Sequence, residues 1–118
     1  MKIKFKLKNK NLEIREIQEC KGVKKAIGLM FSNQQKASAL LFNFKNTTQT
    51  SIHSFFCPYF LAIWLKDSRV VDYEIVKRWR FYIKPSSEFN ALIEVPLNKK
   101  YKSIIDFFDN TTNPSVKT

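Results

Sequence analysis

The chain has 118 residues, of which 44% are hydrophobic and 14% aromatic, a size and composition that fit one folded domain and exclude a disordered chain. Its 21 Lys and Arg residues exceed its 10 Asp and Glu residues, so the formal net charge is +11. This charge makes polyanions and anionic membrane surfaces plausible partners. Because 17 of the 21 basic residues are Lys, a Lys-rich host composition explains the same charge without any ligand.

The two cysteines, Cys20 and Cys57, and the single histidine, His53, lack the number and spacing of zinc ligands. The first residues alternate Lys with apolar side chains and contain no signal-peptide core. No stretch approaches the ~18 uninterrupted apolar residues of a membrane-spanning helix. We therefore expect a cytoplasmic protein with reduced thiols and with no metal, cofactor or transmembrane segment.

Residues 1–8 alternate Lys with apolar side chains, which predicts a strand with four lysines on one face. A turn and a second alternating stretch at 12–17 complete a β-hairpin. The lysine row either prevents edge-to-edge aggregation or binds a polyanion.

The rest of the chain predicts short strands and two short helices. In chain order these are a helix at 22–30, strands at 40–45, 52–57, 59–65, 70–76, 78–84 and 91–95, and a helix at 101–108. This pattern predicts a mainly β fold, either a compact antiparallel sandwich, jelly-roll-like, or a half-open barrel. We expect one β domain at 1–109 and a flexible C-terminal tail at 110–118.

The stretch I-H-S-F-F-C-P-Y-F at 52–60 holds His53 and Cys57 four residues apart. A cysteine nucleophile needs a base within about 3 Å, whereas four residues of a strand span roughly 13 Å. The pattern therefore predicts that Cys57 is a buried small hydrophobic residue. His53 is either a hydrogen-bonded strand residue or a ligand contact.

Basic and aromatic residues interleave in K-R-W-R-F-Y-I-K at 77–84. A strand divides this segment between two faces, with Arg78, Arg80 and Tyr82 on one and Trp79, Phe81 and Ile83 on the other. The first face is suited to clamping a phosphate and stacking a base, and the second is typical of a core. Alternatively, the arginines contact a partner protein or form ion pairs across the sheet with Asp72, Glu74 or Glu94.

No motif identifies a reaction. The chain has no phosphate-binding loop, dinucleotide-binding glycines or nucleophile elbow. Asp106 and Asp109, three residues apart on the predicted C-terminal helix, are too few to define a metal site. An enzyme that uses His53 or a carboxylate in a small pocket is one alternative, and it requires a titratable group with a perturbed pKa in that pocket.

Several stretches follow one another in a recognisable order: G-L-M-F at 28–31, A-L-L-F-N-F at 39–44, I-H-S-F-F-C-P-Y-F-L-A-I-W-L at 52–65, R-V-V at 69–71, and K-R-W-R-F-Y-I-K-P with L-I-E-V-P at 77–85 and 92–96. Together they resemble the domain of unknown function 192 family, small uncharacterised proteins of archaea and bacteria. The resemblance spans about residues 12–97. It implies a compact antiparallel β structure with little helix. It does not point to any particular activity, because the family's function is not established.

The chain departs from this family pattern at three places. Phe60 stands where the family has Asp, Arg78 stands where it has Pro, and residues 98–110 replace a Gly-rich segment. We therefore expect no polar role at the position of Phe60.

The sequence favours a non-enzymatic binding or accessory module for an anionic ligand or a partner protein. The predicted ligand-facing residues are His53, Arg78, Arg80 and Tyr82, with Trp79 as a core anchor beneath them. Nonspecific nucleic-acid binding is the first alternative, and the enzyme described above is the second.

Overall fold

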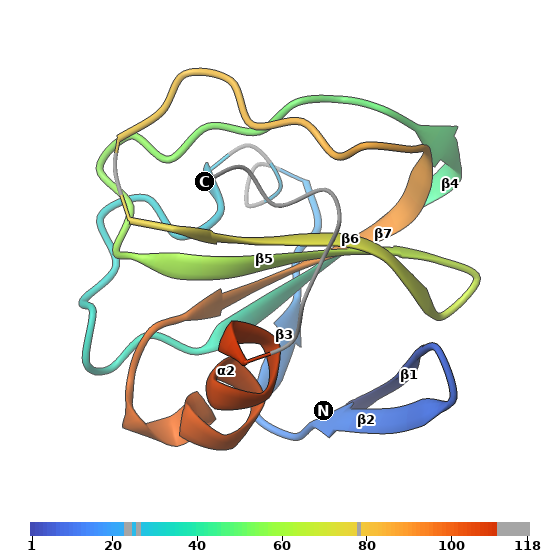
Figure 1. Ribbon diagram of the computed structural model, residues 1–118. Coiled ribbons are helices and arrows are strands. Elements are labelled where there is room, and N and C mark those ends of the chain that lie inside the picture. The colour runs from blue at the N-terminus through green and yellow to red at the C-terminus, as the bar shows by residue number, and fades with distance from the viewer. Residues whose placement is uncertain (23–24, 26, 78, 111–118) are drawn as a thin grey trace.

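The computed structural model describes residues 1–110 except 23, 24, 26 and 78, and the described strands form one seven-stranded mixed sheet that curves into a half-barrel (Figure 1). The strands are β1 (Ile3–Leu7), β2 (Lys10–Ile14), β3 (Ile17–Glu19), β4 (Ala39–Thr48), β5 (Phe60–Lys66), β6 (Arg69–Val76) and β7 (Phe89–Pro96). Their order in the sheet is β2-β1-β6-β5-β7-β4-β3.

The predicted mainly β class is confirmed, and of the architectures considered the half-open barrel describes the fold. The sheet is not purely antiparallel, because β1 runs parallel to β6 and β3 runs parallel to β4. Of the predicted lysine row, Lys4 and Lys6 lie on β1, which pairs with β2 along its whole length and with β6 at one position, Lys6 with Arg69.

The central strand β5 explains how the sheet is stabilised. All of its residues except Lys66 are buried, as expected for a strand covered on both faces. Its side chains alternate between two apolar clusters: Leu61, Ile63 and Leu65 face one, and Phe60, Ala62 and Trp64 face the other. The sheet therefore separates two cores.

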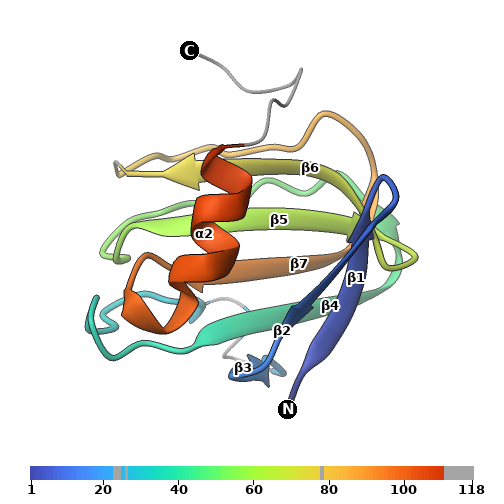
Figure 2. The ribbon, with the colours of Figure 1, turned by 60° about the horizontal axis from the view of Figure 1, so that its bottom comes forward.

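A helix covers the first of these faces. The 3-10 turn η1 (Lys99–Tyr101) leads into α2 (Lys102–Asp109), which crosses the sheet (Figure 2). Phe108 of α2 is buried, and its ring centroid lies 4.7 Å from that of Tyr73. The C-terminal helix predicted at 101–108 is thus present, whereas the helix predicted at 22–30 falls partly outside the described residues.

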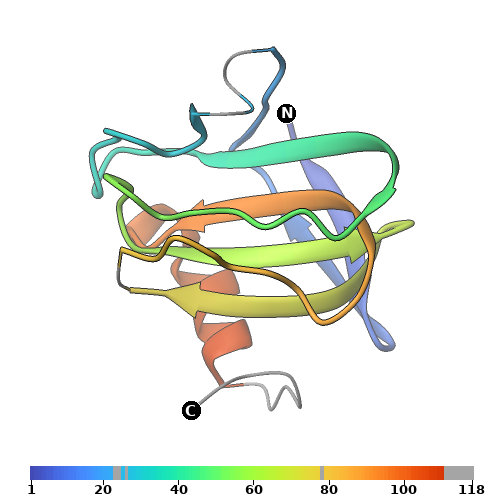
Figure 3. The same cartoon turned by 90° about the horizontal axis from the view of Figure 1, so that it is seen from above.

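Two loops cover the second face, one between β4 and β5 and one between β6 and β7, and they run side by side across the sheet (Figure 3). Ile52 and Ile83 exchange two backbone hydrogen bonds of 2.8 Å. Ser54 donates its N–H to the Arg80 carbonyl at 3.0 Å, and its hydroxyl accepts the Arg80 N–H at 2.7 Å. These bonds tie the two loops together.

The strands predicted at 52–57 and 78–84 are wrong for the described residues, because only an isolated bridge joins the two segments. Phe56 has a φ of +56° and Pro58 lacks an N–H, so neither continues a strand ladder. The predicted two-faced pattern therefore fails at Trp79 and Phe81, whereas Ile83 is buried as predicted. Trp79 and Phe81 are 59% and 82% exposed rather than core residues, and Trp79 is no core anchor.

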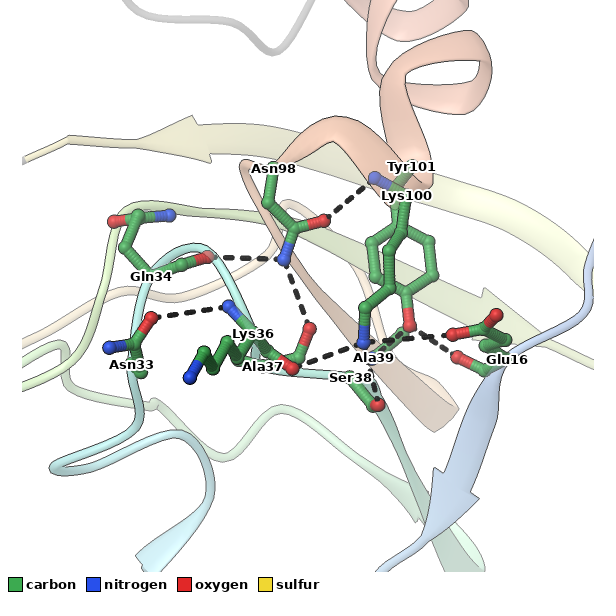
Figure 4. A network of polar contacts seen from close by, with 10 residues as sticks. All are labelled: Glu16, Asn33, Gln34, Lys36, Ala37, Ser38, Ala39, Asn98, Lys100 and Tyr101. Atoms are coloured by element: carbon green, nitrogen blue, oxygen red, sulfur yellow. Dashed lines mark hydrogen bonds and ion pairs between the residues drawn. The ribbon is translucent and has the colours of Figure 1, made fainter.

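A polar network joins the C-terminal segment to the edge of the sheet (Figure 4). The Tyr101 hydroxyl donates to the Glu16 carbonyl and accepts the Ala39 N–H at 2.7 Å. The Asn98 amide donates to the carbonyls of Gln34 and Ala37 at 3.1 and 3.0 Å. These contacts place η1 and α2 relative to β3 and β4.

Within the described part of the chain, no helix is both long and apolar enough to cross a membrane.

Candidate functional site

The two loops and a neighbouring turn carry a continuous series of aromatic side chains, which we call the aromatic ridge: Phe31, Phe56, Trp79, Phe55 and Phe81. Ring centroids are 5.1 Å apart between Phe31 and Phe56, 4.7 Å between Phe56 and Trp79, 6.0 Å between Trp79 and Phe55, and 4.3 Å between Phe55 and Phe81. Four of the five rings are exposed, and Phe55 is half-buried. A contiguous exposed apolar surface of this kind is a candidate interaction site.

The backbone holds one end of the ridge in an unfavourable conformation. Phe31 and Phe56 have φ values of +62° and +56°, which cost a non-glycine residue roughly 1–2 kcal/mol each. The Phe31 N–H donates to the Phe56 carbonyl at 2.7 Å. This bond joins the two strained residues, and their rings stack outside the core.

The predicted site residues lie near this ridge where the structure describes them. The His53 ring is 5.8 Å from Phe55, and its Nδ1 accepts the Phe55 N–H at 3.3 Å. Arg80 forms an ion pair with Glu74, as our alternative interpretation of the arginines expected. Tyr82 is 64% exposed, and Arg78 lies outside the described residues.

Basic side chains flank the ridge along the β6–β7 loop. Lys77 and Lys84 are exposed at either end of the segment that carries Trp79 and Phe81. The Arg80 side chain is 38% exposed, and Glu74 neutralises part of its charge. The segment thus presents aromatic rings between positive charges.

Beneath the loops lies a second feature, which we call the Glu94 cavity. It has a volume of about 220 Å³, and its walls include Gly28, Phe42, Phe44, His53, Cys57 and Glu94. It therefore brings the chain's histidine and a cysteine together with a carboxyl group from β7.

Glu94 lies in an apolar part of the sheet. Its partners in register on the two neighbouring strands are Leu40 and Ala62, and the residue is only 6% exposed. Burial raises the pKa of the Glu94 carboxyl to about 8, although a hydrogen bond from the Leu29 backbone N–H opposes that rise. At neutral pH the group is mostly a neutral acid.

The Cys57 thiol is kept unreactive by the same environment. Burial, together with the negative charge of Glu94 when that group ionises, raises the thiol pKa to about 12. The thiolate needed for nucleophilic attack is therefore scarce at neutral pH. This agrees with the prediction that Cys57 acts as a small hydrophobic residue.

Sequence reasoning considered Glu94 only as a partner for an arginine and did not identify a cavity around it. A signal was present, since a single carboxylate stands within the apolar run L-I-E-V at 92–95. Such a residue is costly to bury. Among the residues that the structure describes, no three His, Cys, Asp or Glu side chains gather as a metal-binding group.

One curated relative decides the family. A protein of the UPF0127 family from Pyrococcus horikoshii is 34% identical to the chain over 89 residues, which cover 74% of this chain and 76% of the relative. The chain belongs to the UPF0127 family. No family model and no solved structure matches the chain.

The relative's name states no ligand and no reaction. The UPF0127 assignment confirms the expectation of an uncharacterised protein family. The narrower resemblance to the domain of unknown function 192 family stays a prediction.

Proposed function

We propose that this protein is a non-enzymatic binding module that contacts single-stranded nucleic acid through the aromatic ridge. The observation that carries the proposal is the continuous series of five contacting rings, four of them exposed, on the hydrogen-bonded loops and the neighbouring turn. The membership in the domain of unknown function 192 family that the motifs imply is part of the same proposal, and it adds no activity.

Stacking of nucleobases on the aromatic rings is the first interaction that we expect. A nucleobase that stacks on an exposed aromatic side chain contributes about 1–3 kcal/mol, with little dependence on which base it is. Trp79 and Phe81 project from one loop and Phe56 from the other, and Tyr82 is exposed next to them. Unpaired bases of a single strand can reach such rings, whereas bases stacked inside a duplex cannot.

Attraction between basic side chains and phosphate groups is the second interaction that we expect. The net charge of +11 attracts polyanions over a long range, and Lys77 and Lys84 flank the rings. A partner protein would also cover apolar rings, but it would not need this charge. Planar rings and regularly spaced negative charges occur together in nucleic acids.

Fluorescence anisotropy with a labelled single-stranded oligonucleotide tests the proposal at about 50 and 300 mM salt. We expect binding at low salt and a steep loss at high salt, by about 0.7 log units per log unit of salt for each phosphate contacted. Trp79→Ala and Phe81→Ala should each weaken binding by about five-fold or more. Tyr59→Ala removes another exposed ring, outside the ridge, and should bind like the wild type.

The sequence-predicted arginines are tested in the same assay with the Arg78→Ala/Arg80→Ala double variant. We expect it to stay folded and to bind more weakly. If it unfolds without any ligand present, those arginines are structural. If the wild type fails to bind at low salt, the proposal is wrong and a protein or uncharged ligand takes its place.

A further inference from the structure

We infer that the Glu94 cavity is a binding site for a small primary amine, taken up as its ammonium ion. This inference is independent of the proposed function, because none of the five aromatic residues of the ridge lines the Glu94 cavity. The two therefore succeed or fail separately.

The buried carboxyl group is the first reason. Glu94 is 6% exposed, lines the cavity, and lies between Leu40 and Ala62 on the neighbouring strands. Burial makes the protonated form of this group the more stable one, and a positive charge with hydrogen-bond donors stabilises the ionised carboxylate instead, so binding of such a group releases the Glu94 proton to solvent. An ammonium group supplies both.

The aromatic walls are the second reason. Phe42 and Phe44 line the cavity, and ring faces attract cations. The Nζ atom of Lys25 already lies 5.0 Å from the centroid of the Phe44 ring. Lys25 is exposed and belongs to the wall of the cavity, so this wall accommodates an ammonium group.

Gly28 is the third reason. It has a φ of +55° and lines the cavity next to the carboxyl group. A Cβ atom at this position would lie 3.1 Å from Oε1 of Glu94 and 3.5 Å from Cζ of Phe42. The absence of a side chain leaves that oxygen accessible from the cavity.

The volume limits the size of the ligand. The cavity of about 220 Å³ equals the space of about seven water molecules. It therefore takes an amine with few non-hydrogen atoms, such as n-butylamine. A ligand of this size binds with a dissociation constant in about the millimolar range, so NMR titration is the suitable method.

The test compares n-butylammonium with n-butanol, a neutral molecule of the same shape, on the full chain at about 150 mM salt. Wild-type protein should bind the ammonium at least about ten-fold more tightly than the alcohol, with amide shifts at Gly28, Leu29 and Glu94. Glu94→Gln keeps the shape of the side chain and should lose that preference. Glu88→Gln removes an exposed carboxylate from the residue that precedes β7, and this variant should keep the wild-type preference for the ammonium.

Equal binding of n-butanol and n-butylammonium by the wild type overturns the inference and indicates a merely apolar cavity. An undiminished ammonium preference in Glu94→Gln overturns it as well, as do shifts confined to exposed carboxylates. If Glu94→Gln fails to fold, the comparison of the two ligands on the wild type decides the question by itself.

Discussion

At the scale of single residues, Glu94 links the stability of the fold to the amine site that we propose. Its carboxyl group lies among apolar neighbours in β7, and the raised pKa is the consequence of that burial. A group with a raised acidic pKa makes folding dependent on pH over a defined window.

We predict that stability falls as pH rises from 4.5 to about 8, because over that window the unfolded chain ionises Glu94 while the folded protein holds its proton. At about 1.36 kcal/mol per pH unit, the effect reaches roughly 5 kcal/mol. Urea unfolding of wild type and Glu94→Gln at several pH values measures it, since other titrating groups cancel in the difference. Parallel stability curves for the two proteins would show that Glu94 ionises normally.

Gly28 is predicted to tolerate substitution less well than Gly22. Both have positive φ, +55° and +59°, so Ala at either position costs about 1 kcal/mol from the backbone. Only at Gly28 does the added Cβ meet the carboxyl group of Glu94, which adds roughly 1–3 kcal/mol. Thermal unfolding of the two Ala variants measures the difference, and equal losses would mean that the contact is unimportant.

For single residues, local sequence patterns gave limited information about where each side chain lies in the fold. Cys57, predicted to be buried from its apolar neighbours, is only half-buried, and the exposure of Trp79 and Phe81 contradicts the alternation rule. That rule holds only where a strand exists, and the loop at 77–88 is not one. A cavity around Glu94 depends on loops far away in the chain, which no local pattern reveals.

Among the elements, the regular strands were the most predictable. Alternation identifies the β1–β2 hairpin, and a run of apolar residues identifies β5. The two loops over the sheet were predicted as strands because they are rich in aromatic residues. Some of their side chains pack into the core and others form the exposed ridge. Their composition therefore resembles that of strands.

The attachment of η1 and α2 is predicted to depend on the Tyr101 hydroxyl. Tyr101→Phe leaves the buried Ala39 N–H without this acceptor, which costs about 1–3 kcal/mol. Tyr82→Phe removes an exposed hydroxyl and should change stability by less than about 0.5 kcal/mol. Denaturant unfolding of both variants measures this, and an equal small effect in the two would assign the attachment to apolar packing by Phe108 instead.

On the scale of the whole molecule, different elements cover the two faces of the sheet. The helix and the β1–β2 hairpin close one face of the half-barrel, and the tied loops close the other (Figures 2 and 3). The same loops carry most of the aromatic ridge. The class of this fold was predictable from short strands and polar turns. The mixed pairing was not, because the partner of each strand depends on contacts across the whole chain.

The most direct test of the proposed function uses the intrinsic fluorescence of Trp79. The chain has two tryptophans, and Trp64 is fully buried whereas Trp79 is 59% exposed on the ridge. Titration with an unlabelled oligothymidylate at about 50 mM salt should quench the emission, with affinity lost at about 300 mM salt, and Trp79→Phe should abolish the response. Emission that stays unchanged through the low-salt titration would contradict base stacking on the ridge.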